Sequence, residues 1–191
     1  MRKLILQEFI TIDGFAADTE GGMDAMFGNG EEDGEPHMDF LRPEDDIDTI
    51  LYGAVTYGGM ADYWPTATEA IADKVNAAHI IVFSKSLNHA PWGKQAEATI
   101  IRENATEAVL KLKQQPGKNM IIYGSIKMAQ SLMKDGVIDE YQLRVCPVIL
   151  GKGKRLFSDN TDTLNMELLE TKVYKSGLIL LRYQPDIKKA E

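Results

Sequence analysis

Residues 139–157, DEYQLRVCPVILGKGKRLF, are the most informative stretch of the sequence. An acidic pair opens the stretch, a run that alternates between apolar and polar residues follows, and Pro147 leads through an apolar triplet into a Gly-Lys-Gly-Lys loop. Upstream, residues 121–132 read IIYGSIKMAQSL, which predicts a buried strand, a glycine and a helix that opens on Ser125. The free N–H groups and the dipole at a helix N-terminus stabilise anions. Together with the basic glycine-rich loop, this unit suggests that the protein holds a phosphorylated cofactor.

The composition is that of an ordinary soluble globular protein. The chain has 191 residues, of which 44% are hydrophobic and 26% charged, and no apolar run approaches the roughly 20 residues that cross a bilayer. We therefore expect no membrane partner. The single cysteine, Cys146, cannot form an intrachain disulfide, which fits a cytoplasmic protein, and its apolar surroundings favour a core position. Because no linker interrupts the chain, we expect one domain over residues 1–185 and a tail over residues 186–191.

The negative charge of the chain is concentrated in one segment. The net charge is −8, whereas residues 18–48 contain twelve carboxylates and a single base, Arg42, for a local net charge of −11. The rest of the chain is therefore positive, at +3, and can hold an anion. The acidic segment is typical of a solvated loop with a short helix. We do not expect a nucleic acid partner, because the sequence has no basic face with interleaved aromatic residues.

Strand-like and helix-like segments alternate along most of the chain. The pattern predicts strands at residues 4–12, 47–52, 79–83, 97–101, 120–123, 140–145, 164–174 and 178–183. It predicts helices at residues 55–63, 69–77, 105–113 and 125–135, with Thr68 as the cap of the second and Asn104 as the cap of the third. Residues 18–35 are predicted to form a long loop, and residues 36–41 one helical turn. This order predicts an α/β fold with a mostly parallel sheet, helices on both faces and an antiparallel C-terminal hairpin.

Four of the predicted strands end in residues that suit ligand binding. The ends of parallel strands meet at one edge of a sheet, where ligands bind. The residues at these four ends are Asp13; Gly53, Ala54, Val55 and Thr56; Ser84 and Lys85; and Gly124, Ser125 and Ile126. Taken singly, the serines and the threonine are more often helix caps or turn residues than phosphate ligands, and Asp-Gly is a frequent turn pair. The four ends taken together favour a phosphate site.

Other site types are less well supported. Lys152 and Lys154 could close over the phosphate site or simply decorate a turn, and both interpretations stay open. No Gly-x-Gly-x-x-Gly motif follows the first predicted strand and no Walker loop is present, which disfavours an ordinary Rossmann domain. The three histidines lack the spacing of metal ligands or of a catalytic triad, so no metal site is expected.

The chain resembles the dihydrofolate reductase-like superfamily. More closely, it resembles stand-alone bacterial proteins similar to the C-terminal reductase domain of the bifunctional riboflavin-biosynthesis deaminase-reductase. The resemblance runs from Leu4 to about Arg182, and its longest and most specific motif is the stretch at residues 138–157. Shorter motifs occur in the same order: Ile12-Asp13-Gly14-Phe15-Ala16, Leu51-Tyr52-Gly53 with Thr56-Tyr57, Phe83-Ser84-Lys85-Ser86-Leu87, and Tyr123-Gly124-Ser125.

The resemblance implies a three-layer α/β/α fold around a mixed sheet and an NADPH-dependent reductase. Hydride would pass from NADPH to a pyrimidine- or pterin-like small molecule, as in riboflavin biosynthesis, and Asp13 would sit by the nicotinamide and the substrate. The turn at residues 53–56 and the helix start at residues 124–126 would hold the cofactor phosphates, with Ser84 and Lys85 near the adenosine 2′-phosphate. Members of this family are often homodimers, so we expect a homodimer.

Two positions depart from the family pattern. The family commonly has an arginine at the position of Ala54, where it helps to hold the cofactor phosphate, and one such charged hydrogen bond is worth about 1.5–3 kcal/mol. The family often has Asp-Trp where this chain has Asp24-Ala25, so the apolar wall near the substrate differs. These departures leave a second hypothesis, a non-catalytic protein that binds a nucleotide or another small molecule and has kept the fold. A scaffold without a ligand is a minor third hypothesis, which the retained phosphate-type turns argue against.

Overall fold

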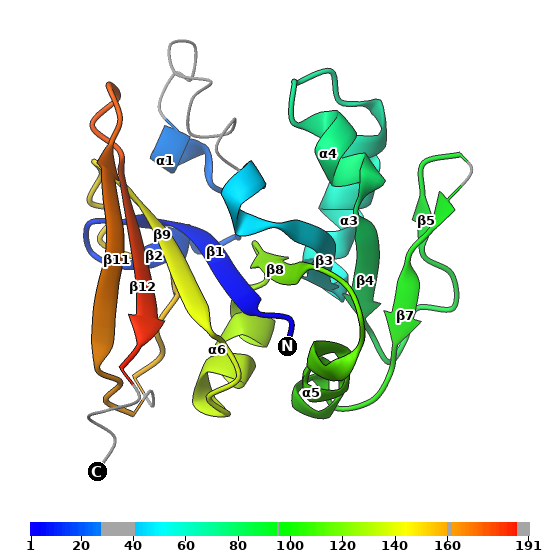
Figure 1. The fold of residues 1–191 in the computed structure, drawn as a ribbon. Coiled ribbons are helices and arrows are strands. Elements are labelled where there is room, and N and C mark those ends of the chain that lie inside the picture. The colour runs from blue at the N-terminus through cyan, green and yellow to red at the C-terminus, as the bar shows by residue number, and fades with distance from the viewer. Residues whose placement is uncertain (28–40, 95, 160–161, 187–191) are drawn as a thin grey trace.

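The computed structural model describes residues 1–27, 41–94, 96–159 and 162–186, and its centre is an eight-stranded sheet (Figure 1). The strand order is β11-β12-β9-β1-β8-β3-β4-β7. From β9 to β7 each strand is parallel to its neighbours. Strand β12 is antiparallel to β9, and β11 is antiparallel to β12. With helices on both faces, this mixed sheet confirms the predicted three-layer α/β/α fold.

The strands and helices have the following bounds. The large sheet contains β1 (Leu4–Thr11), β3 (Ile47–Gly53), β4 (His79–Phe83), β7 (Thr99–Ile101), β8 (Asn119–Tyr123), β9 (Glu140–Cys146), β11 (Met166–Val173) and β12 (Ile179–Pro185). Two small pairs are β2 (Phe15–Ala17) with β10 (Lys154–Arg155), and β5 (Pro91–Trp92) with β6 (Ala96–Glu97). The α-helices are α1 (Asp24–Phe27), α3 (Ala54–Tyr63), α4 (Ala72–Ala77), α5 (Ala105–Gln114) and α6 (Ile126–Lys134), and the 3-10 turns are η1 (Pro43–Asp45) and η2 (Trp64–Thr66). Among the described residues, no helix has the length and apolar character that a membrane span requires.

Each face of the sheet packs against its own helices. Side chains alternate between the two faces along a strand, so Leu6 of β1 points to one face and packs in a cluster with Leu132 of α6. Tyr52 of β3 belongs to the cluster on the opposite face, together with Val75 of α4. In Figure 1, α5 and α6 lie below the central strands, and α3 and α4 lie above them. The strand β1 is buried along its whole length because it lies in the middle of this arrangement.

The C-terminal hairpin forms as the sequence predicts. Strands β11 and β12 pair in antiparallel fashion, from Met166 with Pro185 to Val173 with Ile179. Gly177 lies in the connecting turn with a φ of +84°, a conformation that glycine adopts without strain. The hairpin extends the parallel sheet because β12 also pairs with β9.

Several predicted boundaries differ from the structure. The helix predicted at residues 69–77 begins at Ala72, and Ile71 rather than Thr68 is its N-cap, because a turn precedes it in which the Ala72 N–H donates to the Glu69 carbonyl at 2.8 Å. The strand predicted at residues 97–101 is divided at Ala98, so that β6 pairs with β5 and β7 pairs with β4. Helix α1 lies within the predicted loop at residues 18–35. The rest of that loop from residue 28, and the turn predicted at residues 36–41 apart from its last residue, lie outside the described residues.

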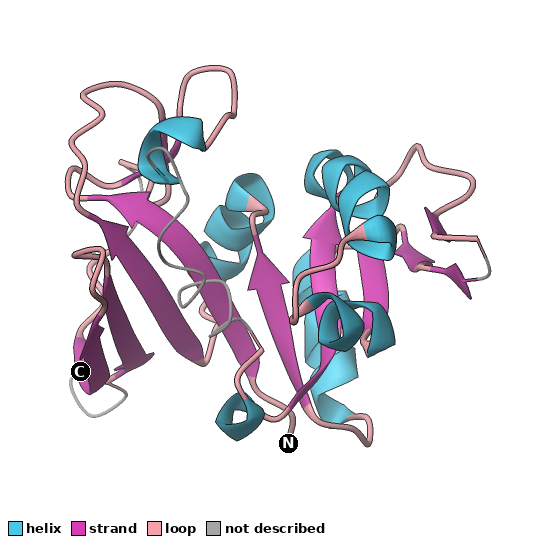
Figure 2. Cartoon of the chain, turned by 90° about the horizontal axis from the view of Figure 1, so that it is seen from above, coloured by secondary structure: helices cyan, strands magenta, loops and turns pink. Residues whose placement is uncertain are grey.

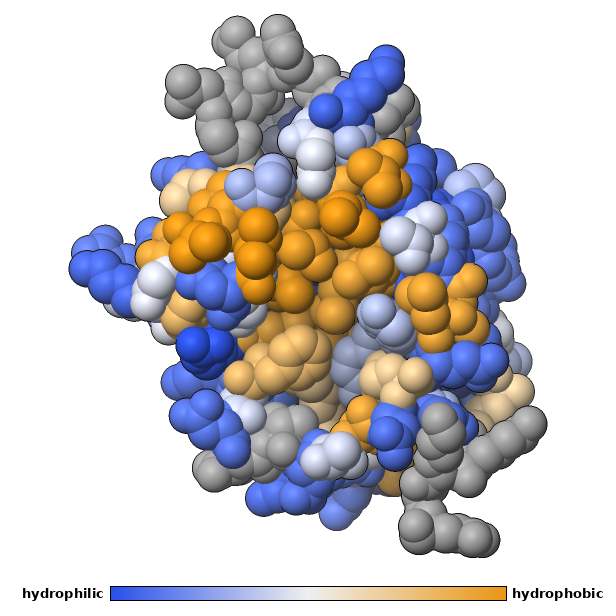
Figure 3. Space-filling view, turned by 90° about the vertical axis from the view of Figure 1, so that its left-hand side faces the viewer, coloured by the Kyte–Doolittle hydropathy of each residue, from blue (hydrophilic) through white to orange (hydrophobic). Residues whose placement is uncertain are grey.

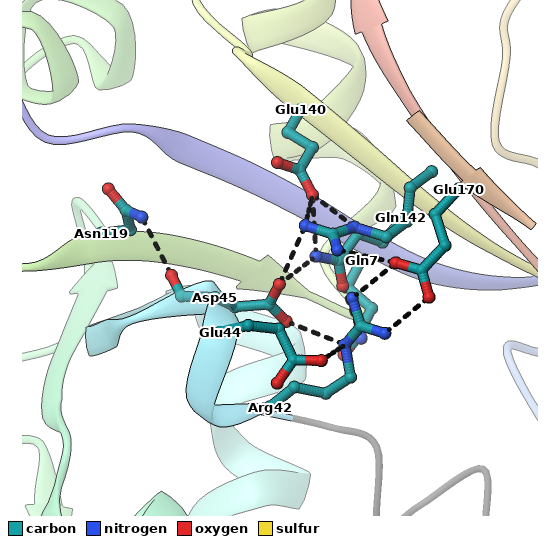
Figure 4. A network of polar contacts seen from close by, with 9 residues as sticks. Gln7, Arg42, Glu44, Asp45, Asn119, Glu140, Gln142 and Glu170 are labelled. Atoms are coloured by element: carbon teal, nitrogen blue, oxygen red, sulfur yellow. Dashed lines mark hydrogen bonds and ion pairs between the residues drawn. The ribbon is translucent and has the colours of Figure 1, made fainter. Parts of the chain in front are cut away.

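A buried network of charged residues connects η1 to the C-terminal strands (Figure 4). Arg182 of β12 contacts Asp45 at 3.1 Å, Glu140 at 2.6 Å and Glu170 at 2.8 Å. Arg42 donates two hydrogen bonds of 3.1 Å to the Glu170 carboxylate. The hydrogen bonds from Arg42 and Arg182 lower the pKa of Glu170 to about 2. Buried charges are tolerated only when they are paired and hydrogen-bonded. The network therefore holds η1, which directly precedes β3, against the C-terminal strands.

Candidate functional site

The parallel strands point the same way (Figure 2), and most of the predicted site residues follow their carboxyl ends at one edge of the sheet. The strands β1, β8, β3 and β4 are consecutive neighbours in the sheet. Asp13 follows β1, Gly124 follows β8, and Gly53 at the end of β3 pairs with Phe83, which precedes Ser84. Residues that are far apart in the sequence therefore come together at this edge, as the sequence predicts.

The start of α3 and the start of α6 are joined by two hydrogen bonds. The Gly53 N–H donates to Ser125 Oγ at 2.9 Å, and Thr56 Oγ1 donates to the Gly124 carbonyl at 2.8 Å. Ser125 occupies the N-cap position of α6, but its buried hydroxyl bonds the neighbouring turn instead of capping its own helix. These contacts place two helix N-termini side by side.

The two helix starts leave backbone donors for a ligand. The first N–H groups of any α-helix have no intrahelical partner, and neither α3 nor α6 has a side-chain cap in the described structure. Val55, at the second position of α3, is 95% exposed, so this helix start is open to solvent. Ala54 precedes it and adds no charge, while Ile126 opens α6. Two helix N-termini with free donors are an arrangement to which an anionic group such as a diphosphate can bind.

Gly124 allows the close approach of these two helix starts. Its φ of +70° is in the left-handed region, which side chains with a Cβ rarely adopt. A Cβ at this position would lie 3.2 Å from Thr56 Cγ2, tighter than an ordinary contact. A larger residue would therefore strain the backbone and push α3 away from α6.

The next strand end carries Ser84 and Lys85, and the structure adds a second cation that the sequence did not indicate. Ser84 Oγ accepts the N–H groups of Ser86 at 3.3 Å and Leu87 at 3.1 Å, so its hydroxyl shapes the turn. Lys85 is exposed in this turn. Arg102, directly after the neighbouring strand β7, donates to the carbonyls of Lys85 at 3.2 Å and Leu87 at 2.5 Å. Pairing of β7 with β4 brings this guanidinium to the site, and only knowledge of the strand order could have predicted it.

Asp13 joins the turn after β1 to the signature stretch. Its carboxylate accepts hydrogen bonds from Thr11 Oγ1 at 2.6 Å, the Gly151 N–H at 2.7 Å and the Leu150 N–H at 3.1 Å. These bonds, with the Thr11 hydroxyl first, lower the pKa of Asp13 to about 2. Asp13 is therefore a fixed negative charge at neutral pH and holds the loop at residues 147–153 against the sheet edge.

The glycine-rich loop packs on the backbone of β2. Gly153 has a φ of +158°, and a Cβ there would lie 2.2 Å from the Ala17 carbonyl oxygen, so the chain needs glycine at this contact. Lys154 follows in β10 and pairs with Ala17, and its charge contributes to the lowered pKa of Asp18, after the Gly22 and Gly21 N–H groups. Lys154 therefore lies in a short strand pair rather than in a turn, with its charge near Asp18.

Glu8 is a buried carboxyl group that the sequence motifs do not indicate. It is 2% exposed, and burial raises its pKa to about 8, against the opposing effect of the Gly124 and Ser125 N–H groups. Among the described residues, no hydrogen-bond partner reaches its Oε1 atom. The signal in the sequence was a charged residue in the middle of the otherwise buried strand LILQEFIT.

An apolar cluster borders the site on the side of α1. It consists of Phe9, Met26, Cys146, Tyr174, Leu178 and Leu180. Met23 and Tyr123 are partly buried against it, and Tyr123 is the last residue of β8. Cys146 is 1% exposed, and burial raises its pKa to about 11, so the predicted core position is confirmed and the thiol stays protonated at neutral pH.

Proteins of known sequence resemble this chain over most of its length. Residues 2–180 match the model of the RibD C-terminal domain family. The uncharacterized protein YyaP of Bacillus subtilis (strain 168) is 31% identical over 187 residues, which cover 95% of this chain and 94% of YyaP.

Solved structures show the same fold. A putative riboflavin biosynthesis protein from Shewanella sp. PV-4 superposes with a TM-score of 0.73 at 18% identity, over 96% of this chain and 99% of its own. A diaminohydroxyphosphoribosylaminopyrimidine deaminase/5-amino-6-(5-phosphoribosylamino)uracil reductase from Thermotoga maritima gives 0.64 at 15% identity, over 96% of this chain and 56% of its own. Dihydrofolate reductase from Enterococcus faecalis, complexed with NADP(H) and RAB-propyl, gives 0.62 at 13% identity, over 96% of both chains. With its sequence matched from residue 2 to residue 180, the chain belongs to the RibD C-terminal domain family.

Proposed function

We propose that the protein is an NADPH-dependent reductase that transfers hydride to a pyrimidine- or pterin-like small molecule. The observation that carries this proposal is the pair of helix starts joined by the Gly53–Ser125 and Thr56–Gly124 hydrogen bonds. Membership of the RibD C-terminal domain family favours the same chemistry. So do the chain's structural neighbours, which include a deaminase/uracil reductase and a dihydrofolate reductase complexed with NADP(H).

The residues at the sheet edge fit such a cofactor. The diphosphate would lie over the free N–H groups at residues 54–56 and 126–128, where Gly124 keeps the approach open. The 2′-phosphate would lie near the turn that begins at Ser84, within reach of the cations of Lys85 and Arg102. This second contact is what would distinguish NADPH from NADH. Ala54 stands where the family pattern commonly has an arginine, so the cofactor would depend more heavily on backbone donors.

When bound, NADPH supplies the hydride, and the protein positions the partners and stabilises charge. Asp13 stays ionised at neutral pH because its pKa is about 2. It therefore cannot act as a proton donor, and we assign it the stabilisation of positive charge on the substrate or the orientation of a water molecule. The apolar cluster beside α1, with Met23 and Tyr123 at its margin, would face the planar ring of the substrate and exclude water.

A second candidate function is the binding of a nucleotide without catalysis. Ala54 favours this second function, because an alanine cannot make a charged hydrogen bond to the cofactor phosphate. A reductase would need other contacts to supply the binding free energy that is lost. The two functions differ in whether bound NADPH is oxidised.

Titration with NADPH and NADH, followed by absorbance assays with pyrimidine and pterin substrates, separates these candidates. A reductase binds NADPH more tightly than NADH and oxidises it when the substrate is added. Tight binding without oxidation across an adequate substrate panel supports the binder. Failure of both nucleotides to bind at millimolar concentration contradicts both. We place the reaction in the cytoplasm, which the single cysteine favours.

We also propose that the chain forms a homodimer through one uncovered face of its C-terminal strands. The pairs Val145–Ile179 and Leu143–Leu181 are only partly buried, and Val173 of β11 is 69% exposed. Figure 3 shows a continuous apolar surface on this side of the molecule. A face of this kind normally meets a partner, and a second copy would bury it on both chains. Light scattering should give twice the chain mass for the wild type and the chain mass for Val173→Lys; a monomeric wild type would contradict the proposal.

A further inference from the structure

Glu8 lies beneath the start of α6, on the same face of β1 as Leu6. The register of β1 and β8 ends with Gln7 opposite Tyr123, so the next residues along the two strands are Glu8 and Gly124. The Gly124 and Ser125 N–H groups act on the Glu8 carboxyl group, whose Oε1 atom has no hydrogen-bond partner within the described part of the chain. A buried, incompletely paired carboxyl group therefore points at a helix N-terminus that is open on its other side.

The charged groups around Glu8 do not neutralise it. Tyr123 of β8 is held neutral at physiological pH, since burial and the charge of Glu8 raise its pKa to about 12. Arg144 of β9 lies over the Phe9 ring, 5.5 Å from the ring centroid, and so belongs to the opposite face of the sheet. The residue of β9 that pairs with Glu8 is the apolar Leu143, and Lys127 in the first turn of α6 is exposed to solvent.

We infer that Glu8 couples nucleotide binding to a proton: the uncharged form of Glu8 accepts a nucleotide diphosphate at the α6 start, and the ionised form opposes it. The inference rests on the proposed function, since it names a control of the same site. It assigns to Glu8 no contact with the reacting atoms, and makes it a positioning residue for the anion.

The coupling follows from two negative groups that share one helix N-terminus. An ionised Glu8, on which the Gly124 and Ser125 N–H groups act, lies at the same positive end of α6 that a diphosphate bound over residues 126–128 also needs. Ionisation of Glu8 therefore weakens the binding of the diphosphate. By thermodynamic linkage, the bound diphosphate disfavours ionisation of Glu8 by the same free energy. A nucleotide that binds above the Glu8 pKa must take up one proton from solvent, which converts the carboxylate to the acid.

The affinity for NADPH should therefore fall as the pH rises. With a pKa of about 8, Glu8 is mostly protonated at about pH 7 and mostly ionised at about pH 9, which predicts a loss of about tenfold in affinity. The test is calorimetric titration of the full chain with NADPH at both pH values, for the wild type and for Glu8→Gln, which keeps the shape and cannot ionise. We expect the loss in the wild type and less than a twofold change in Glu8→Gln. Adenosine 2′-monophosphate, which lacks the diphosphate, should show no comparable loss with the wild type.

The outcomes separate this inference from the proposed function. Equal wild-type affinity at both pH values, or the same loss in Glu8→Gln, would overturn the role of Glu8 while leaving nucleotide binding in place. Absence of NADPH binding at both pH values by both proteins would overturn the proposed function itself. If Glu8→Gln does not fold, wild-type titrations at about pH 9 in two buffers of different ionisation enthalpy decide the matter: uptake of nearly one proton supports the inference, and no uptake refutes it.

Discussion

Replacement of Glu8 by glutamine should stabilise the protein, and increasingly so as the pH rises. Burial raises the pKa of Glu8 from 4.5 to about 8, so the folded protein binds more protons than the unfolded chain between these values. The stability that protonated Glu8 contributes therefore decreases with pH across this window and is lost fully above the folded pKa of this group. The rise of the Glu8 pKa from 4.5 to about 8 corresponds to about 5 kcal/mol of unfolding free energy as an upper bound, of which about 3.5 kcal/mol appears between about pH 5 and about pH 8.

Urea unfolding of the wild type and Glu8→Gln at these two pH values measures this effect without any ligand. The quantity to compare is the difference in unfolding free energy between the two proteins, because groups common to both cancel. We expect Glu8→Gln to gain on the order of 2–4 kcal/mol over the wild type on going from about pH 5 to about pH 8. A difference that is independent of pH would show that Glu8 is already ionised at low pH, and would refute the reasoning.

Three further predictions concern the nucleotide site. Ala54→Arg should restore a charged hydrogen bond to the cofactor and tighten NADPH binding about tenfold or more, as measured by titration; unchanged affinity would mean that the phosphate lies elsewhere. Lys85→Ala combined with Arg102→Ala should weaken NADPH by about tenfold or more and leave NADH nearly unchanged, since only NADPH carries the 2′-phosphate; equal losses would contradict the assignment. Asp13→Asn should keep NADPH affinity within about threefold and lower turnover by about a hundredfold, since the fixed negative charge is removed; turnover equal to that of the wild type would exclude the proposed role.

Much of the fold could be predicted, because the helix-cap and turn residues agree with the overall order of strands and helices. Asn104 caps α5 as predicted, with its side chain accepting the N–H groups of Thr106 and Glu107, because the cap is decided by residues within one turn. Alternating strands and helices were sufficient to predict the parallel sheet and its helix-covered faces. The C-terminal hairpin was predictable from the Gly177 turn between two strand-like runs.

The site was only partly predictable, since its contacts depend on strand order. Ser125 has the sequence appearance of a helix cap, yet its hydroxyl accepts the Gly53 N–H from a turn 72 residues away. Arg102 reaches the Ser84 turn because β7 lies next to β4, which the sequence does not specify. Thr68 was predicted as a cap by residue type alone, and a turn before α4 takes up the space instead. Glu8 was not predicted as a site residue, because the residue pattern along a central strand does not show which of its faces lies next to a helix start.

The binding of the nucleotide diphosphate between the starts of α3 and α6 is the central claim. Backbone amide chemical shifts, followed by NMR during titration with NADPH, test it most directly. We predict saturable shifts for the amides of residues 53–56 and 124–128, with those of β11 unaffected. Saturable binding that shifts other amides and leaves both helix starts unchanged would contradict the claim, and so would the absence of any shift at millimolar NADPH.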